Sequence, residues 1–182
     1  MKKEWLFIAI AAAVVFLGGG TLFVVQSFKT RKEFYDGLLP SAKQLEKETG
    51  ISPDITLTQA AHETNFGQDA GLSKPPNYNL FGIKAGSSWT GRKASYTTHE
   101  TIGGQSIVVK SDFRAYSSYL DSMRDWASLL VRLYPQAYQA AQNGDIRAFG
   151  EGLKKGKAGA YATDPNYTTA LVKVHDAVEA LA

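Results

Sequence analysis

The chain has 182 residues, of which 44% are hydrophobic and 12% aromatic, so it is long and apolar enough to fold as one domain with an appendage. Its formal net charge is +3, and residues 1–30 carry +2 of it, so the remainder has no basic excess and we expect no nucleic-acid partner. The sequence contains no cysteine, which excludes disulfides, thiolate nucleophiles and cysteine zinc sites and is compatible with an exported protein.

An uncharged run of 23 residues extends from Leu6 to Phe28. At about 1.5 Å per residue, a helix of this length crosses a bilayer core of about 30 Å. A cleaved signal peptide is the alternative, because it shares the basic start and the apolar middle. No small-x-small cleavage site follows the run, so we expect residues 1–30 to be a transmembrane anchor or signal-anchor that contacts the membrane through residues 6–28.

Helical spacing of apolar residues begins after this run, with Phe34, Leu38, Ala42 and Leu45. Pro40 interrupts the pattern, which predicts either two short helices or one kinked helix over Arg31–Thr49, closed by Gly50. Ser52 and Pro53 then supply a cap and a first-turn proline for a second helix that ends near Glu63. Gln59 lies four residues before Glu63, so both side chains share one face of that helix.

The middle of the chain changes character. Residues 67–79 are dense in Gly, Pro and Asn and predict a loop. Residues 92–100 are rich in Tyr and Thr, Gly103-Gly104 marks a turn, and residues 105–110 contain three consecutive β-branched residues, so we expect a β-hairpin.

The last third of the chain returns to helical patterns. We expect helices over residues 118–134, 137–142 and 145–153, and a last helix that begins at Thr163-Asp164-Pro165, is capped by Asp164 or Thr163, and runs to about Leu181. The predicted fold class is therefore α+β: a mainly helical domain over residues 31–182 with one small inserted β-hairpin.

Glu63 is the strongest catalytic candidate from the residues alone. A carboxyl sheltered by apolar neighbours has its charged form disfavoured, so its pKa rises and it can act as a general acid near neutral pH. A solvated glutamate at a helix end is an equally good interpretation. Glu100 lies near the tip of the predicted hairpin and could supply the second carboxylate that sugar hydrolysis uses, although glutamates near turns are usually just solvated.

Other chemistries find little support. A helical zinc motif around His62 would need a histidine at position 66, which is Phe66, and we expect no metal and no cofactor. His62, His99 and His175 are interpreted as surface or supporting polar residues. No phosphate-binding loop and no Gly-x-Ser-x-Gly motif occur. Tyr161 can stack on a sugar and donate a hydrogen bond from its hydroxyl.

Five motifs in order then resemble a known family. They are QAAHETNFG (59–67), NLFGIK (79–84), TTHE (97–100), FRAY (113–116) and YATDPNY (161–167). Together they resemble glycoside hydrolase family 73, the peptidoglycan β-N-acetylglucosaminidases that include the hydrolase domain of the flagellar rod-cap protein. The resemblance runs from about Phe34 to the C-terminus.

The resemblance implies a lysozyme-like fold and cleavage of the glycan strand of peptidoglycan after N-acetylglucosamine, by a monomeric catalytic domain on the wall side of the membrane. It implies that Glu63 is the general acid, Glu100 the base on the hairpin, and Tyr161 a group close to the reaction centre. Assistance by the substrate's N-acetyl group would make Glu100 dispensable. The remaining motif residues become expected substrate-binding residues: Gln59, Asn79, Phe81 and Tyr167.

Two alternatives stay open within that resemblance. One is cleavage after N-acetylmuramic acid, and the other is a glycan-binding or assembly protein that keeps the fold without the chemistry. His62 departs from the family pattern, which commonly has Leu at this position, and so could alter the environment of the acid. The rod-cap protein's long assembly domain is absent from this sequence, which favours wall remodelling or phage lysis over a flagellar role.

Overall fold

The computed structural model describes residues 28–182 except 70, 103–104, 158 and 163, and the side chains of residues 98–107 are also outside the description. Its elements, in chain order, are α1 (Arg31–Thr49), α2 (Pro53–Thr64), β1 (Lys93–Ile102), β2 (Gln105–Arg114), α3 (Tyr119–Leu133), α4 (Pro135–Gln142), α5 (Ile146–Leu153) and α6 (Tyr167–Glu179). The predicted mainly helical α+β fold with one hairpin is confirmed.

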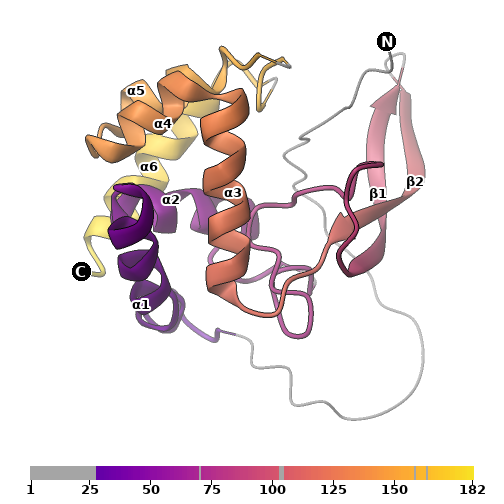
Figure 1. Ribbon diagram of the computed structural model, residues 1–182, viewed down its shortest axis with the longest axis horizontal. Helices are drawn as coiled ribbons and strands as arrows, with labels where there is room; N and C mark the ends of the chain where they lie inside the picture. The colour runs from indigo at the N-terminus through magenta and orange to yellow at the C-terminus, as the bar shows by residue number, and fades with distance from the viewer. Residues whose placement is uncertain (1–27, 70, 103–104, 158, 163) are drawn as a thin grey trace.

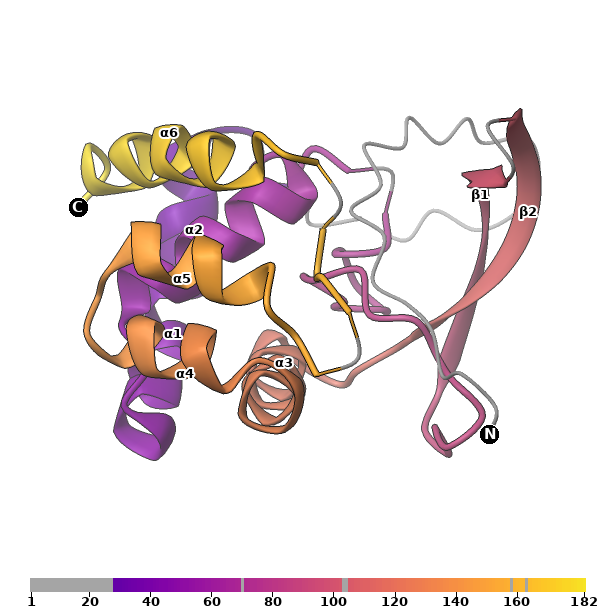
Figure 2. The same ribbon diagram turned by 90° about the horizontal axis from the view of Figure 1, so that it is seen from above.

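The helices and the hairpin occupy opposite sides of α3. Helices α1, α2, α4, α5 and α6 gather on one side, and the hairpin extends from the other, in both views (Figures 1 and 2). The core lies among the helices, where Leu38, Leu57 and Trp126 have no exposed surface. This arrangement leaves the hairpin joined to the helical body mainly at its base.

Helix α1 buries the predicted apolar stripe, since Phe34, Leu38, Ala42 and Leu45 are all at most 1% exposed. Thr30 caps its start by accepting a hydrogen bond from the Glu33 amide at 3.1 Å, and Gly50 ends it with a left-handed φ of 76°. Pro40 lies inside one continuous helix, so of the two predicted alternatives the single helix is correct and the two short helices are not. Because Pro40 is exposed, solvent can satisfy the carbonyl that loses its helical partner.

Helix α2 is the central helix of the fold. It begins at Pro53 as predicted, although the Ser52 side chain makes no capping hydrogen bond. Every residue from 55 to 61 is buried, which marks a helix surrounded by protein on all sides. Three of these residues are polar, Thr56, Thr58 and Gln59, and buried polar groups need protein partners.

The hairpin is longer than predicted. Strands β1 and β2 pair antiparallel from Lys93 opposite Arg114 to Ile102 opposite Gln105. The FRAY motif therefore begins inside β2 and does not follow it. Gly103-Gly104, the predicted turn, lies outside the described residues.

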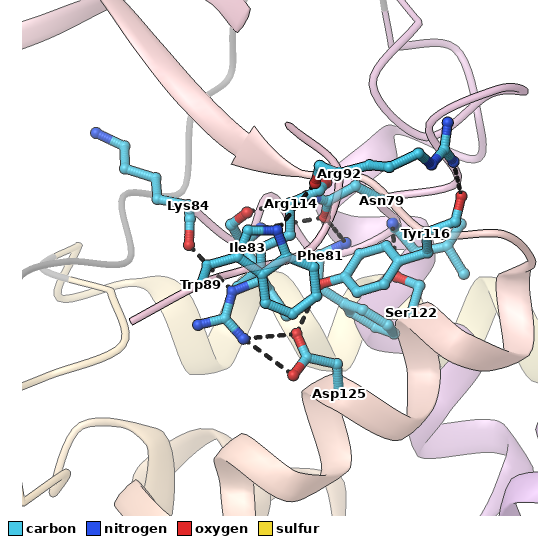
Figure 3. A network of polar contacts seen from close by, with 11 residues as sticks. Asn79, Phe81, Ile83, Lys84, Trp89, Arg92, Arg114, Tyr116, Ser122 and Asp125 are labelled. Atoms are coloured by element: carbon cyan, nitrogen blue, oxygen red, sulfur yellow. Dashed lines mark hydrogen bonds and ion pairs between the residues drawn. The ribbon is translucent and has the colours of Figure 1, made fainter. Parts of the chain in front are cut away.

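A polar network fixes the base of the hairpin to α3 (Figure 3). One guanidinium nitrogen of Arg114 donates to both carboxylate oxygens of Asp125, at 2.9 and 2.8 Å, and the Tyr116 hydroxyl donates to the same carboxylate at 2.7 Å. The Arg114 guanidinium also lies 4.7 Å from the centre of the Trp89 ring. Asp125 thus links the end of β2, the following segment and α3 at one point.

The start of the last helix differs from the prediction. Helix α6 begins at Tyr167 with Asn166 as its N-cap and no side-chain capping bond. Asp164 instead accepts a hydrogen bond from the Asn166 amide at 2.8 Å, which closes a turn ahead of the helix. The expected cap by Asp164 is therefore wrong, and Thr163 lies outside the described residues.

The predicted membrane span, residues 6–28, lies outside the described residues except for Phe28. The half-buried Phe28 ring packs edge-on against Phe34 at 5.3 Å, and its carbonyl accepts a hydrogen bond from the Gln68 side chain at 2.9 Å. Among the described helices, none is both long and apolar enough to cross a bilayer.

Candidate active site

Glu63 lies in the last turn of α2, next to a backbone segment that few sequences adopt. The three residues after Thr64 all have positive φ: Asn65 at 47°, Phe66 at 55° and Gly67 at 75°. The Thr64 hydroxyl donates to the Ala60 carbonyl and accepts from the Gly67 amide, which holds the turn. Non-glycine residues with positive φ store strain and tend to occur at functional sites.

The end of α2 lies beside the start of α6, on the side of the helical body that faces the hairpin (Figure 2). Tyr167, the first residue of α6, donates its hydroxyl hydrogen to Oε1 of Glu63 at 3.3 Å. Gln59, one turn earlier on α2, donates from Nε2 to the same Oε1 at 2.7 Å and to the Tyr167 hydroxyl at 2.8 Å. Gln59, Glu63 and Tyr167 thus form one closed hydrogen-bonded group.

Burial raises the pKa of Glu63 to about 8, and the hydrogen bonds from Tyr167 and Gln59 oppose this rise. The residue is still partly exposed, while Gln59 and Tyr167 are buried. A carboxyl with this pKa is mostly protonated at pH 7, so it can give a proton to a bound molecule.

Aromatic rings surround this group. The Tyr161 ring lies 6.3 Å from the Tyr167 ring and packs edge-on against Tyr134 at 5.6 Å. Burial raises the pKa of the Tyr161 hydroxyl well above its usual value, the charge of Glu63 adds to this rise, and the nearby Gln59 amide opposes it. Tyr161 therefore lies beside the Glu63 group as a neutral phenol.

His62 also packs against Tyr167, with ring centres 5.0 Å apart and the two rings nearly perpendicular. Burial lowers the pKa of His62, against a smaller opposing effect of Asp164. His62 is partly buried and His175 is 9% exposed, with its Nδ1 3.0 Å from the Thr58 hydroxyl. The interpretation of His175 as a supporting residue fits this contact, and a surface position does not.

Asn79 lies apart from this group, and its side chain forms hydrogen bonds only with backbone groups of the described residues. Its amide nitrogen donates to the carbonyls of Ile83 and Arg114, and its oxygen accepts from the amides of Phe81 and Ile83. All four hydrogen-bonding positions of the side chain are filled, and the residue is 1% exposed. Asn79 thus shapes the loop before the hairpin, and its predicted contact with the substrate stays a prediction.

Phe81 is also a core residue. It is 2% exposed and stacks on Trp126 with ring centres 4.7 Å apart and planes 9° apart. The ring therefore has a packing role in the core, and its predicted contact with the substrate stays a prediction.

The expected partner carboxylate, Glu100, lies on β1. Glu100 pairs with Ile107 across the hairpin, but its side chain lies outside the described residues. No cluster of metal-ligating side chains occurs in the described ranges.

Tyr134 was missed by the sequence interpretation, since nothing at the end of α3 indicates that it packs on Tyr161.

Comparison with known proteins shows which family this chain belongs to. The family model for Glucosaminidase, described as mannosyl-glycoprotein endo-β-N-acetylglucosaminidase, matches residues 39–180. The peptidoglycan hydrolase FlgJ of Salmonella typhimurium is 36% identical over 152 residues, which is 82% of this chain and 47% of that protein. A probable N-acetylmuramidase of Lactococcus lactis is 30% identical, over 78% of this chain and 32% of its own. The chain thus spans about half or less of the length of these relatives.

Solved structures of related proteins also superpose on this chain. The crystal structure of a peptidoglycan hydrolase mutant from Sphingomonas sp. A1 superposes with a TM-score of 0.68 at 35% identity, covering 82% of this chain and 97% of that one. The family model matches residues 39–180 in one continuous stretch, which includes the second half of α1, the hairpin and all the later helices. This chain belongs to the glucosaminidase family.

Proposed function

We propose that this protein is a peptidoglycan hydrolase that cleaves the β-1,4 bond after N-acetylglucosamine in the glycan strand. The observation that carries the proposal is the Glu63 carboxyl, with a pKa raised to about 8 and two hydrogen-bond donors on one of its oxygens. Family membership supports the reaction class, and the names of two relatives, a peptidoglycan hydrolase and a probable N-acetylmuramidase, support the substrate.

Glu63 acts as the general acid in this proposal. Its proton passes to the glycosidic oxygen as the bond from that oxygen to the sugar's C1 breaks, and the carboxyl becomes a carboxylate. Water then supplies the hydroxyl at C1, and its second proton must leave to a base. The products are two glycan fragments, one of which has a new reducing end.

Glu100 is our proposed base for that water, and Tyr161 is the group that orients the N-acetyl substituent. In an inverting reaction the two carboxyl groups lie about 6.5 to 9.5 Å apart, and in a covalent one about 5 to 5.5 Å. In an N-acetyl-assisted reaction Glu100 is dispensable. Glu100→Gln then costs much less activity than Glu63→Gln, which distinguishes the two routes.

Cleavage after N-acetylmuramic acid is the second candidate, favoured by the relative named as a probable N-acetylmuramidase. Reduction of the fragments with borohydride, followed by identification of the reduced sugar, separates the two bonds. N-Acetylglucosaminitol supports our proposal, whereas N-acetylmuramitol supports the alternative.

We further propose that residues 31–182 form the catalytic domain and that residues 1–30 anchor it to the membrane on the wall side, for wall remodelling or phage lysis. The domain needs no metal or other cofactor for this reaction and acts as a monomer. The glycan strand is its proposed partner.

Turnover of purified peptidoglycan by the 182-residue chain tests the proposal. Glu63→Gln should abolish fragment release while the variant still binds the wall, because the amide has no acidic proton. Glu46→Gln, which changes an exposed glutamate on α1, is the matched control and should keep full activity. Binding without turnover by the unchanged chain would instead identify a glycan-binding protein.

A further inference from the structure

We propose that Gln59 is a positioning residue that fixes Oε1 of Glu63 as a hydrogen-bond acceptor and thereby leaves the transferable proton on Oε2. The proposal rests on the proposed role of Glu63 as general acid. It replaces the substrate contact that the sequence suggested for Gln59 with an action through Glu63.

The Gln59 amide group is fixed in place. Its side chain has no exposed surface, and both hydrogens of Nε2 are used, one by Glu63 at 2.7 Å and one by Tyr167 at 2.8 Å. Gln59 precedes Glu63 by one helical turn on α2, so the helix itself sets the distance between the two side chains. A buried side chain with both donor hydrogens used is poorly suited to contact a sugar directly.

The two donors define the state of the acid. A protonated carboxyl has one hydroxyl oxygen and one carbonyl oxygen, and the carbonyl oxygen is the better acceptor. Oε1 accepts from Gln59 and from Tyr167, whereas the described residues make no hydrogen bond to Oε2. The proton therefore resides on Oε2, the oxygen that remains available to a substrate.

The same arrangement acts again after proton transfer. The carboxyl of Glu63 then carries a negative charge, and hydrogen bonds to a charged acceptor are shorter and stronger than those to a neutral one. The two donors are already in place, so the charge is stabilised without reorganisation. Gln59 thus contributes to the chemical step and little to binding.

Other ionisable groups face Glu63 as well. Tyr167 contacts it directly, Tyr161 lies beside Tyr167, and His62 also packs against Tyr167, with Asp164 nearby. The two tyrosines have pKa values raised well above the usual value and stay neutral in the relevant range. An amide does not titrate, so the effect of Gln59 can be separated from theirs.

The test is Gln59→Leu in the 182-residue chain, with the titration of Glu63 followed by ¹³C NMR of its labelled side-chain carboxyl. Loss of the Gln59 donor should raise the pKa of Glu63 and move the alkaline limb of the activity profile to higher pH. It should also lower kcat about 10-fold to 100-fold, with KM changed less than about twofold. The NMR titration needs no turnover, so it tests Gln59 even if the proposed reaction is wrong.

Thr58→Val is the matched control. Thr58 is also fully buried on α2, and its hydroxyl contacts His175 at 3.0 Å, not Glu63. This variant should lower thermal stability without moving the pKa of Glu63. If Gln59→Leu behaves like the control, or if it raises KM and leaves kcat unchanged, Gln59 is a structural or substrate-binding residue and the inference is wrong.

A second variant covers the case in which Gln59→Leu does not fold. Tyr167→Phe removes the longer of the two hydrogen bonds to Oε1, at 3.3 Å, and keeps the ring. It should raise the pKa of Glu63 in the same direction but less. No change or a fall of that pKa in Tyr167→Phe would contradict the assignment of Oε1 as the acceptor. A rise in the pKa of Glu63 on Gln59→Leu substitution, in a chain whose unchanged form hydrolyses no glycan, would support the inference and refute the proposed function.

Discussion

The carboxyl of Glu63 combines partial exposure with burial strong enough to raise its pKa to about 8. Only the protonated form can act as a general acid, so activity should fall as the pH rises through about 8. The measurement is kcat/KM on peptidoglycan between pH 5 and pH 10. Activity that is constant to pH 10 would mean that Glu63 does not supply the proton.

The same carboxyl makes stability depend on pH. Its pKa is about 8 in the folded chain and near the ordinary 4.5 in the unfolded chain, so the folded state holds an extra proton between these values. The free energy of unfolding therefore falls as the pH rises from 4.5 to 8 and is lowest above 8. Glu63→Gln removes this loss.

We expect Glu63→Gln to be more stable than the unchanged chain at pH 9, by on the order of 2 kcal/mol, and to differ from it much less at pH 5. The estimate is below a full conversion of the pKa change because the side chain is partly exposed. Thermal unfolding at both pH values measures the difference, and Glu46→Gln controls for loss of a surface charge. The idea fails if the two unfolding curves differ equally at pH 5 and pH 9.

Local spacing in the sequence predicted the contact between Gln59 and Glu63, whereas Tyr167 was expected at the site only from the resemblance to a family. The four-residue spacing placed Gln59 and Glu63 on one helical face, and their hydrogen bond confirms it. Tyr167 meets Glu63 across 104 positions only because α6 packs on α2, and no local pattern predicts that contact. The side chains of Asn79 and Phe81 are of types that often contact ligands. In the structure, however, Asn79 hydrogen-bonds to the backbone and Phe81 stacks on Trp126.

At the scale of elements, the turn that ends α2 is the most constrained backbone near the site. Gly67 has a φ of 75°, and a Cβ there would lie 2.8 Å from the Phe28 ring and 3.2 Å from the Phe34 ring. Gly67→Ala should therefore lower stability by about 2–3 kcal/mol through backbone strain and crowding together. Urea unfolding measures it, and kcat should fall with it because Glu63 lies four residues before the glycine.

Two other glycines separate the causes. Gly144 has a φ of 70° with open space around its Cβ position, so Gly144→Ala should cost only the strain, about 1–2 kcal/mol. Gly86 has open space and no positive φ, so Gly86→Ala should be nearly neutral. Equal losses at Gly67 and Gly144 would show that Phe28 and Phe34 move aside without cost.

Element types were predictable from the sequence, whereas several ends were not. The apolar stripe and the glycine cap predicted α1 and its end. The spacing of apolar residues could not show that Pro40 faces solvent and that the helix is continuous. The proline-containing segment before α6 suggested that the helix begins earlier. Asp164 instead accepts a hydrogen bond from the Asn166 amide in a turn before the helix, and α6 begins at Tyr167. The extra length of β2 comes from tertiary contacts, since Arg114 pairs with Lys93 and with α3.

At the scale of the whole molecule, the hairpin and the helical body meet at the contact between Arg114 and Asp125 (Figure 3). The side chains are 14% and 21% exposed, so the pair is largely shielded from water. Removal of one partner from such a pair leaves an uncompensated charge. Asp125→Ala should therefore lower stability by about 2–4 kcal/mol and also free the Tyr116 hydroxyl.

The loss of stability in Asp125→Ala should be larger in the hairpin than in the helical core. Hydrogen exchange should speed up more at the amides of β2 near Arg114 than at those of α2, because the pair holds the hairpin and the core holds α2. The control is Glu48→Ala, which breaks the exposed contact of Glu48 with Arg124 and should cost less than about 1 kcal/mol. If Asp125→Ala speeds exchange equally in α2 and β2, the pair stabilises the whole fold, and hairpin and helices then unfold as one unit.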